Sequence, residues 1–176
     1  MKLISCTIEN FGKLNNVTYD FSGECNTICE DNGWGKSTLA SFIRVMFYGF
    51  KNESKKKLVD KERNRLMPWQ KGVYGGEIVF ETGGVVYSLR RTFGKKQVDD
   101  EFLLVRKDTN VECDDFSCDI GEELFKIDAQ SFERTVFIGQ SDCVTATTDS
   151  INAKIGNLAD NTDDINNFET AVGRLT

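Results

Sequence analysis

The sequence predicts an α/β fold, and three observations support this class. Apolar and polar side chains alternate over residues 4–8, which is typical of a half-buried strand. Apolar side chains recur at helical spacing over residues 36–47, which indicates an amphipathic helix. Residues 77–107 contain three further strand-like runs separated by turn residues. We therefore expect strands, then a helix, then an antiparallel meander.

The first 49 residues predict three strands and one helix. The first strand covers residues 4–8, and the second repeats the alternation over residues 17–21. Residues 26–29 predict a short third strand, which is followed by a loop. The helix begins at Lys36 and ends before Gly49, because glycine commonly caps helix C-termini.

The meander is predicted from turn chemistry as well as from alternation. Thr82-Gly-Gly84 separates strand-like runs at residues 77–81 and 85–91, which is a strong hairpin signal. Residues 102–107 predict the next strand, and the acidic stretch 108–123 predicts a loop.

After residue 123 the sequence predicts a short helix, then one more strand, then further helix. Asp128 can cap a short helix, and residues 136–138 are expected to form a buried strand. A helical pattern begins at Ser150, and over residues 165–175 its apolar side chains are spaced three, four and three apart. This is the a/d rhythm of a coiled coil, although a surface helix of a globular domain gives the same stripe. The pattern stops at Thr176 without a capping signal, so we expect a longer natural protein.

Composition and charge exclude several functions. The 176-residue chain has a net charge of −6, which argues against a general nucleic-acid binder. It contains no histidine, so a catalytic or metal-ligating histidine is excluded. Six cysteines permit three disulfides, but C-x-x-C spacings and a signal peptide are absent, so we expect reduced thiols. No run of 18 apolar residues exists, and we expect a cytoplasmic protein without a membrane span.

A phosphate-binding motif, Asn32-Gly-Trp-Gly-Lys-Ser-Thr38, lies between the third strand and the helix. Gly33 and Gly35 let the backbone adopt positive φ and bring N–H groups close to phosphate oxygens. The helix that begins near Lys36 adds the positive end of its dipole. The lysine of this pattern reaches the β- and γ-phosphates of a bound nucleotide.

Two hydroxyl residues complete the motif. Ser37 would ligate Mg²⁺, and Thr38 would donate to the α-phosphate. We expect Asn32 and Trp34 to contribute to the same site, where Trp34 either shapes the loop or covers the phosphates. The expected cofactors are therefore ATP and Mg²⁺.

The motif departs from its usual form at its first position. A phosphate-binding loop normally begins with glycine, whereas this chain has Glu30 there. A glutamate is compatible with nucleotide binding if its side chain points outward, and it repels the triphosphate if it points inward. A working site, a loop that has lost nucleotide binding and a chance match are the three alternatives, and we favour the working site.

Residues 51–71 differ in charge from the rest of the chain. Eight basic and three acidic residues give this segment a local charge of +5. It is either a solvated loop or a surface that contacts the phosphates of a nucleotide or of DNA.

Three separated stretches resemble a known family of ATPases. They are Met1–Gly12, Asn32–Leu39 and Glu133–Gln140, and they occur in the same order as in the N-terminal half of SMC, SbcC and RecF-type proteins. Within that group the chain looks most similar to the YhaN-like coiled-coil ATPases. The resemblance extends over essentially the whole chain.

The resemblance implies an ABC-type ATPase head that is split by a long coiled coil. Residues 1–149 would form the N-terminal lobe, a P-loop NTPase fold with a mixed sheet around the loop helix and the antiparallel meander beside it. Residues 150–176 would begin the coil. Gln140 matches the family glutamine that contacts Mg²⁺ and the attacking water, although taken alone it is an ordinary polar residue at a strand end.

The resemblance also suggests which residues surround the nucleotide. Relatives often place a basic residue near the nucleotide where this chain has Lys13. Arg63, Arg65 and the stretch Met67–Trp69 lie in the region that often approaches the base or the ribose.

Other family motifs are absent from the sequence, namely the Walker B acids, the signature motif and the D-loop. Relatives carry them in a C-terminal half, so the expected partners are that half-head, a second head in a homodimer, DNA and a nuclease subunit. The implied function is an ATPase in DNA repair or chromosome maintenance. This chain alone would bind nucleotide weakly or not at all and would turn over essentially none. The alternative is a non-catalytic scaffold whose loop is structural and whose coil recruits partners.

Overall fold

The computed structural model describes residues 1–23, 25–50 and 61–137, and the chain divides into two compact units, Met1–Ile120 and Gly121–Thr176. The predicted α/β class is confirmed. The strands are β1 (Lys2–Phe11), β2 (Leu14–Asp20), β3 (Gly75–Thr82), β4 (Val85–Thr92), β5 (Glu101–Arg106) and β6 (Val111–Glu112). The helices are α1 (Lys36–Tyr48), α2 (Glu62–Arg65), the 3₁₀ helix η2 (Gln97–Asp99), α3 (Ile120–Phe125) and α4 (Ala129–Thr135).

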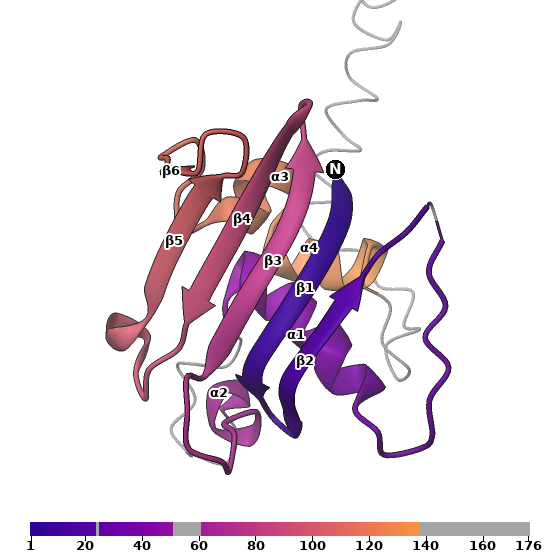
Figure 1. The fold of residues 1–176 in the computed structure, drawn as a ribbon. Helices are drawn as coiled ribbons and strands as arrows, with labels where there is room; N and C mark the ends of the chain where they lie inside the picture. The colour runs from indigo at the N-terminus through magenta and orange to yellow at the C-terminus, as the bar shows by residue number, and fades with distance from the viewer. Residues whose placement is uncertain (24, 51–60, 138–176) are drawn as a thin grey trace, which may run out of the picture. The chain divides into compact units, whose positions relative to one another are not determined.

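One six-stranded sheet organises the first unit, and its strand order is β2-β1-β3-β4-β5-β6 (Figure 1). Every neighbouring pair of described strands is antiparallel. The described residues therefore contain the expected meander but not the parallel pairing of the expected mixed sheet. Parallel neighbours require crossover connections, whereas β1–β2 and β3–β4 are joined by tight turns that enforce antiparallel pairing.

The core of the first unit lies between the sheet and α1, which crosses one face of it in Figure 1. Alternation along β1 directs Cys6 to this face, where its side chain is fully buried. The ring of Phe42 meets Phe11 edge-on at 5.3 Å, and Phe47 meets Phe80 at 5.6 Å. Each buried phenylalanine contributes about 1.5–3 kcal/mol, so this cluster fixes α1 against the sheet.

Glycines at positive φ end two elements, as predicted. Gly49 caps α1 at φ 74°, and its N–H donates to the carbonyl oxygen of Val45 at 2.8 Å. Gly83 and Gly84 join β3 to β4 at φ 58° and 79°. Positive φ at both central residues is what a type I′ hairpin turn requires.

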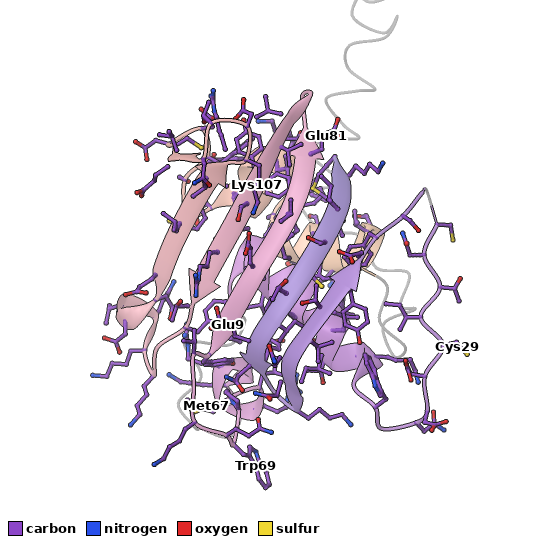
Figure 2. The ribbon with its side chains drawn as sticks, in the orientation of Figure 1. Glu9, Cys29, Met67, Trp69, Glu81 and Lys107 are labelled. Carbon is purple, nitrogen blue, oxygen red and sulfur yellow. The ribbon has the colours of Figure 1, made fainter. Side chains whose placement is uncertain are left out.

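The opposite face of the sheet carries exposed ion pairs. Arg90 lies 2.7 Å from Glu9, and Lys107 lies 3.1 Å from Glu77. Figure 2 shows Glu9 and Lys107 on the face turned toward the viewer. Exposed pairs of this kind contribute about 0–1 kcal/mol each, so this face adds little to stability.

The predicted strand at residues 26–29 is wrong. These residues are not in a strand, and within the described part of the chain they make no backbone hydrogen bond to a neighbouring strand. A strand needs a partner for its N–H and C=O groups, and no described strand pairs with this segment, in which Asn26, Thr27 and Cys29 are exposed. The apolar residues alone therefore did not suffice to predict the element.

Two predicted loops contain regular structure. The segment from Lys61 onward forms α2, in which Glu62 and Arg63 are buried, so a wholly solvated loop is wrong for this part. The acidic stretch 108–123 contains β6 and the beginning of α3. The buried face of α2 relies on a contact distant in sequence, the ion pair of Glu62 with Arg44, whereas β6 pairs with the neighbouring strand β5.

The second unit confirms one prediction and corrects another. Asp128 caps α4, and its carboxylate accepts from the N–H of Ser131 at 2.6 Å. Val136 follows α4 and is exposed, so the strand predicted at residues 136–138 is wrong for the two described residues. Gln140, the proposed boundary at residues 149–150 and the coiled coil at 150–176 lie outside the described residues.

Candidate functional site

The phosphate-binding loop connects the segment after β2 to the N-terminus of α1. Gly33 has φ 84° and Gly35 has φ 128°, conformations that residues with a side chain rarely adopt. A Cβ atom at Gly35 would lie 2.9 Å from Leu14 Cδ2 and 3.3 Å from Lys13 Cε. Glycine is therefore required at position 35 both for the backbone and for space.

The loop is wrapped around the ammonium group of Lys36. Its Nζ atom donates to the carbonyl oxygen of Glu30 at 2.5 Å and to that of Asp31 at 3.0 Å. The ammonium has three donors, of which two hold the loop and the third has no partner among the described residues. The side chain of Lys36 is exposed at the start of α1, where the helix dipole favours an anion.

The substitution at the first loop position concerns Glu30, whose side chain is exposed. The pKa of Tyr19 is raised from its ordinary value by burial and, next, by the negative charge of Glu30. The loop uses the backbone carbonyl of Glu30, which any residue type provides, to hold Lys36.

Trp34 connects the loop to the sheet. Its ring meets Tyr19 of β2 edge-on at a centroid distance of 5.8 Å. Such aromatic pairs contribute about 0.5–1.5 kcal/mol beyond the area that they bury. Of the two predicted roles for Trp34, this contact corresponds to shaping the loop.

The β1–β2 turn lies against the loop and the first turn of α1. A Cβ atom built on Gly33 would be 4.0 Å from Lys13 Nζ, and one built on Gly12 would be 2.9 Å from Thr38 Cγ2. The structure therefore brings Lys13 close to the loop, while the nucleotide contact that the resemblance suggests for Lys13 stays a prediction. Ser37 is exposed in the same turn of α1, and Asn32 is exposed in the loop.

A pocket of about 500 Å³ opens beside Thr38. It is lined by Gly12, Lys13, Thr38, Arg65, Leu66, Met67, Trp69 and Gln70. The indole of Trp69 is 98% exposed, and Figure 2 shows it beyond Met67 at the end of the sheet where β1 ends and β3 begins. A flat aromatic side chain held so far into solvent can stack on a planar ligand.

The loop that carries Trp69 is anchored at one end to the β1–β2 turn and at the other to the end of β1. The N–H of Gly12 donates to the carbonyl oxygen of Leu66 at 2.7 Å. The side-chain amide of Asn10 donates to the carbonyl oxygen of Val73 at 3.1 Å. These bonds fix the pocket wall relative to the phosphate-binding loop.

Arg63 does not line this pocket, which corrects its expected contact with the nucleotide. Its guanidinium is 2% exposed and donates to both carboxylate oxygens of Asp100, at 2.6 and 2.8 Å. It also lies over the ring of Phe50 at 4.5 Å. Residues two apart on a helix differ in direction by about 200°, so Arg65 faces the pocket while Arg63 faces the core.

Three residues of the site were not singled out from the sequence. Gly12 is needed for its close approach to Thr38, and Leu66 and Gln70 contribute to the pocket wall. A turn signal is present at Gly12, but the sequence contains no signal for Gln70.

Metal binding at this site would depend on the Ser37 hydroxyl. No group of three or more His, Cys, Asp or Glu side chains that could hold a metal ion occurs among the described residues. An exposed hydroxyl at a helix N-terminus fits Mg²⁺, because this ion is commonly bound through few protein ligands together with substrate phosphates.

The loop, the helix N-terminus and the enclosed lysine together define a P-loop nucleotide-binding domain. A family model described as an AAA domain matches residues 5–175. The chain therefore belongs to the AAA domain family. Within the described part of the chain, no helix is long and apolar enough to cross a membrane.

A curated relative adds a more specific similarity. The chain is 35% identical over 82 residues to the uncharacterized protein YhaN of Bacillus subtilis (strain 168). The match covers 46% of this chain and 8% of that protein, so the chain spans only a small part of the relative's length. The predicted resemblance to SMC-type and YhaN-like ATPase heads is confirmed.

Proposed function

We propose that this chain binds Mg-ATP at its P-loop and, once completed by a C-terminal half-head, hydrolyses it to ADP and phosphate. The observation that carries this proposal is the loop of residues 30–35 closed around the Lys36 ammonium at the N-terminus of α1. Backbone N–H groups, a helix dipole and a lysine at one point form an anion site suited to phosphates.

Each residue of the motif has a distinct role in this proposal. Lys36 contacts the β- and γ-phosphates, and Thr38 donates to the α-phosphate. The Ser37 hydroxyl would hold Mg²⁺, which would supply positive charge against the charge that develops on the phosphates. Gln140, which lies outside the described residues, would contact the metal and the attacking water.

The pocket beside Thr38 takes the base and the ribose. Lys13 and Arg65 supply positive charge at its rim, while Met67 and Trp69 supply apolar and aromatic surface. Stacking of a base on an indole contributes about 1–3 kcal/mol. The adenine ring therefore lies against Trp69.

Turnover requires groups that this sequence does not contain. A Walker B acid and a signature motif from a second head complete the site, because phosphoryl transfer depends on positioned charges around the γ-phosphate. ATP binding joins two heads, and hydrolysis separates them. This cycle acts on DNA, which the basic residues of 51–71 contact, apart from the buried Arg63 and from Arg65, which lines the nucleotide pocket. A nuclease subunit cooperates with the heads in DNA repair or chromosome maintenance. The chain alone turns over essentially no ATP.

Calorimetric titration of Mg-ATP tests the nucleotide site. Wild-type chain and Lys96→Ala, which removes an exposed lysine outside the site, should bind equally, and Lys36→Ala should not bind. If the wild-type chain shows no heat, the same titration on the full-length protein decides. Binding there that survives Lys36→Ala, or no binding at all, would contradict the proposal.

The second candidate is a scaffold that does not bind nucleotide. Glu30 at the first loop position and the two bonds from Lys36 to the loop's own carbonyls favour it, because they stabilise the loop without a ligand. In that case Lys36→Ala would destabilise the fold, and Mg-ATP would leave the melting temperature of the wild-type protein unchanged.

A further inference from the structure

We propose that a second pocket in the first unit binds a small monocarboxylate through Arg91, a function separate from the nucleotide site. The pocket has a volume of about 250 Å³ and lies between Tyr48–Phe50 at the end of α1, strands β4 and β5, and residues 118–119. The P-loop lies at the other end of α1. Thirteen helical residues at 1.5 Å each place the two sites about 20 Å apart.

Arg91 of β4 is a buried cation with few partners. It is 9% exposed, its guanidinium lies 5.0 Å from the centre of the Phe102 ring, and one of its nitrogens donates to the carbonyl oxygen of Cys118. Its Nε atom is buried without a hydrogen-bond partner among the described residues. Burial lowers the pKa of Arg91, and the nearby Cys118, Asp100 and Asp119 offset this only in part.

The carboxylates of the pocket do not supply the missing hydrogen-bond acceptors for the Arg91 guanidinium. Both oxygens of Asp100 accept from Arg63, and one of them also accepts the N–H of Gly94 at 3.0 Å. Within the described part of the chain, no carboxylate lies within ion-pair distance of Arg91. Buried charges in native proteins are normally paired, so this guanidinium indicates an acceptor that the chain itself does not provide.

The geometry and the charge of the pocket select the ligand class. A guanidinium presents Nε–H and Nη–H as a planar fork that matches the two oxygens of a carboxylate. A volume of about 250 Å³ has room for a small ligand. Glu101 and Asp119 are exposed in the pocket wall, and they disfavour a dianion such as phosphate or sulfate. The ligand class that fits the pocket is therefore a small planar group with one negative charge, such as a monocarboxylate.

Thermal unfolding with sodium acetate as the probe tests this proposal, with sodium chloride of equal ionic strength as the reference. Acetate at ten times its Kd should raise Tm by about 3–6 °C in the wild-type chain. Arg90→Gln is the matched control, because Arg90 is the neighbouring residue on the opposite face of β4 and is exposed. It should respond like the wild type, and Arg91→Gln should not respond. Equal responses in all three proteins, or none in the wild type, would overturn the proposal.

A second measurement, made on the wild-type chain, does not depend on whether Arg91→Gln folds. The Nε–H resonance of Arg91 should move with acetate and saturate, and phosphate should move it much less. Lys36→Ala should leave this response unchanged, which separates it from failure of the nucleotide site. A shift that grows without saturation would identify an adventitious additive only, and it would refute the proposal, as would a larger shift with phosphate.

Discussion

Gly35→Ala is the substitution whose effect on the P-loop can be worked out most directly from the structure. Gly35 has φ 128°, and an added Cβ would lie 2.9 Å from Leu14 and 3.3 Å from Lys13. Backbone strain of this kind costs about 1–3 kcal/mol, and relief of the two contacts moves the loop away from the β1–β2 turn. We therefore expect a lower free energy of unfolding and a loss of Mg-ATP affinity of about tenfold or more, equivalent to about 1.4 kcal/mol.

Gly84→Ala provides the matched control for this experiment. Gly84 also has positive φ, at 79°, but it belongs to the β3–β4 turn, and a Cβ atom added there would meet nothing within 4 Å. Its substitution should cost about 1–2 kcal/mol of backbone strain and leave nucleotide binding intact. Urea unfolding gives the stability of both variants, and calorimetry gives the affinity. Equal affinity of Gly35→Ala and wild type would refute the proposed role of the close contact.

Three further predictions concern other parts of the chain. Glu62→Ala removes the carboxylate that pairs with Arg44, and both side chains of this pair are buried, at 3% and 2% exposed. The substitution should lower the free energy of unfolding, measured in urea, by about 3–5 kcal/mol. Glu9→Ala, which breaks an exposed pair with Arg90, should change the same free energy by less than about 1 kcal/mol. Burial raises the pKa of the Cys6 thiol to about 12, so its thiolate forms only near that pH. Alkylation at pH 8, read by mass spectrometry, should therefore label the exposed Cys29 but should label Cys6 only after urea is added. Labelling of both cysteines in the folded protein would contradict the buried position of Cys6. Trp69→Ala should weaken Mg-ATP binding roughly tenfold without a change in Tm, because its indole is 98% exposed; an unchanged Kd would place the base elsewhere.

The local elements were predictable because their signals lie within a few residues. Period-two alternation identified β1, helical spacing identified α1, and consecutive glycines at 83 and 84 identified the β3–β4 turn. Asp128 caps α4 through a contact only three residues away. In each case the physical cause of the element is contained in the stretch that forms it.

The features that depended on distant residues were not predictable from the sequence. Residues 26–29 have the composition of a strand, but no described strand pairs with them. The sequence does not distinguish Arg63 from Arg65, because both are arginines in the same short basic stretch. Only the packing of α2 shows that Arg63 pairs with Asp100 while Arg65 lines the pocket. Lys13 lies near Gly33 of the P-loop, and the resemblance suggested this residue because relatives often place a basic residue near the nucleotide.

The most direct test of the central claim is a backbone amide NMR titration of this chain with Mg-ATP, which detects weak as well as tight binding. If the P-loop binds the phosphates, the largest and saturable shifts should occur at Gly33, Gly35, Lys36 and Ser37, and they should be absent in Lys36→Ala. Shifts that centre elsewhere, or shifts that persist in the variant, would contradict the account.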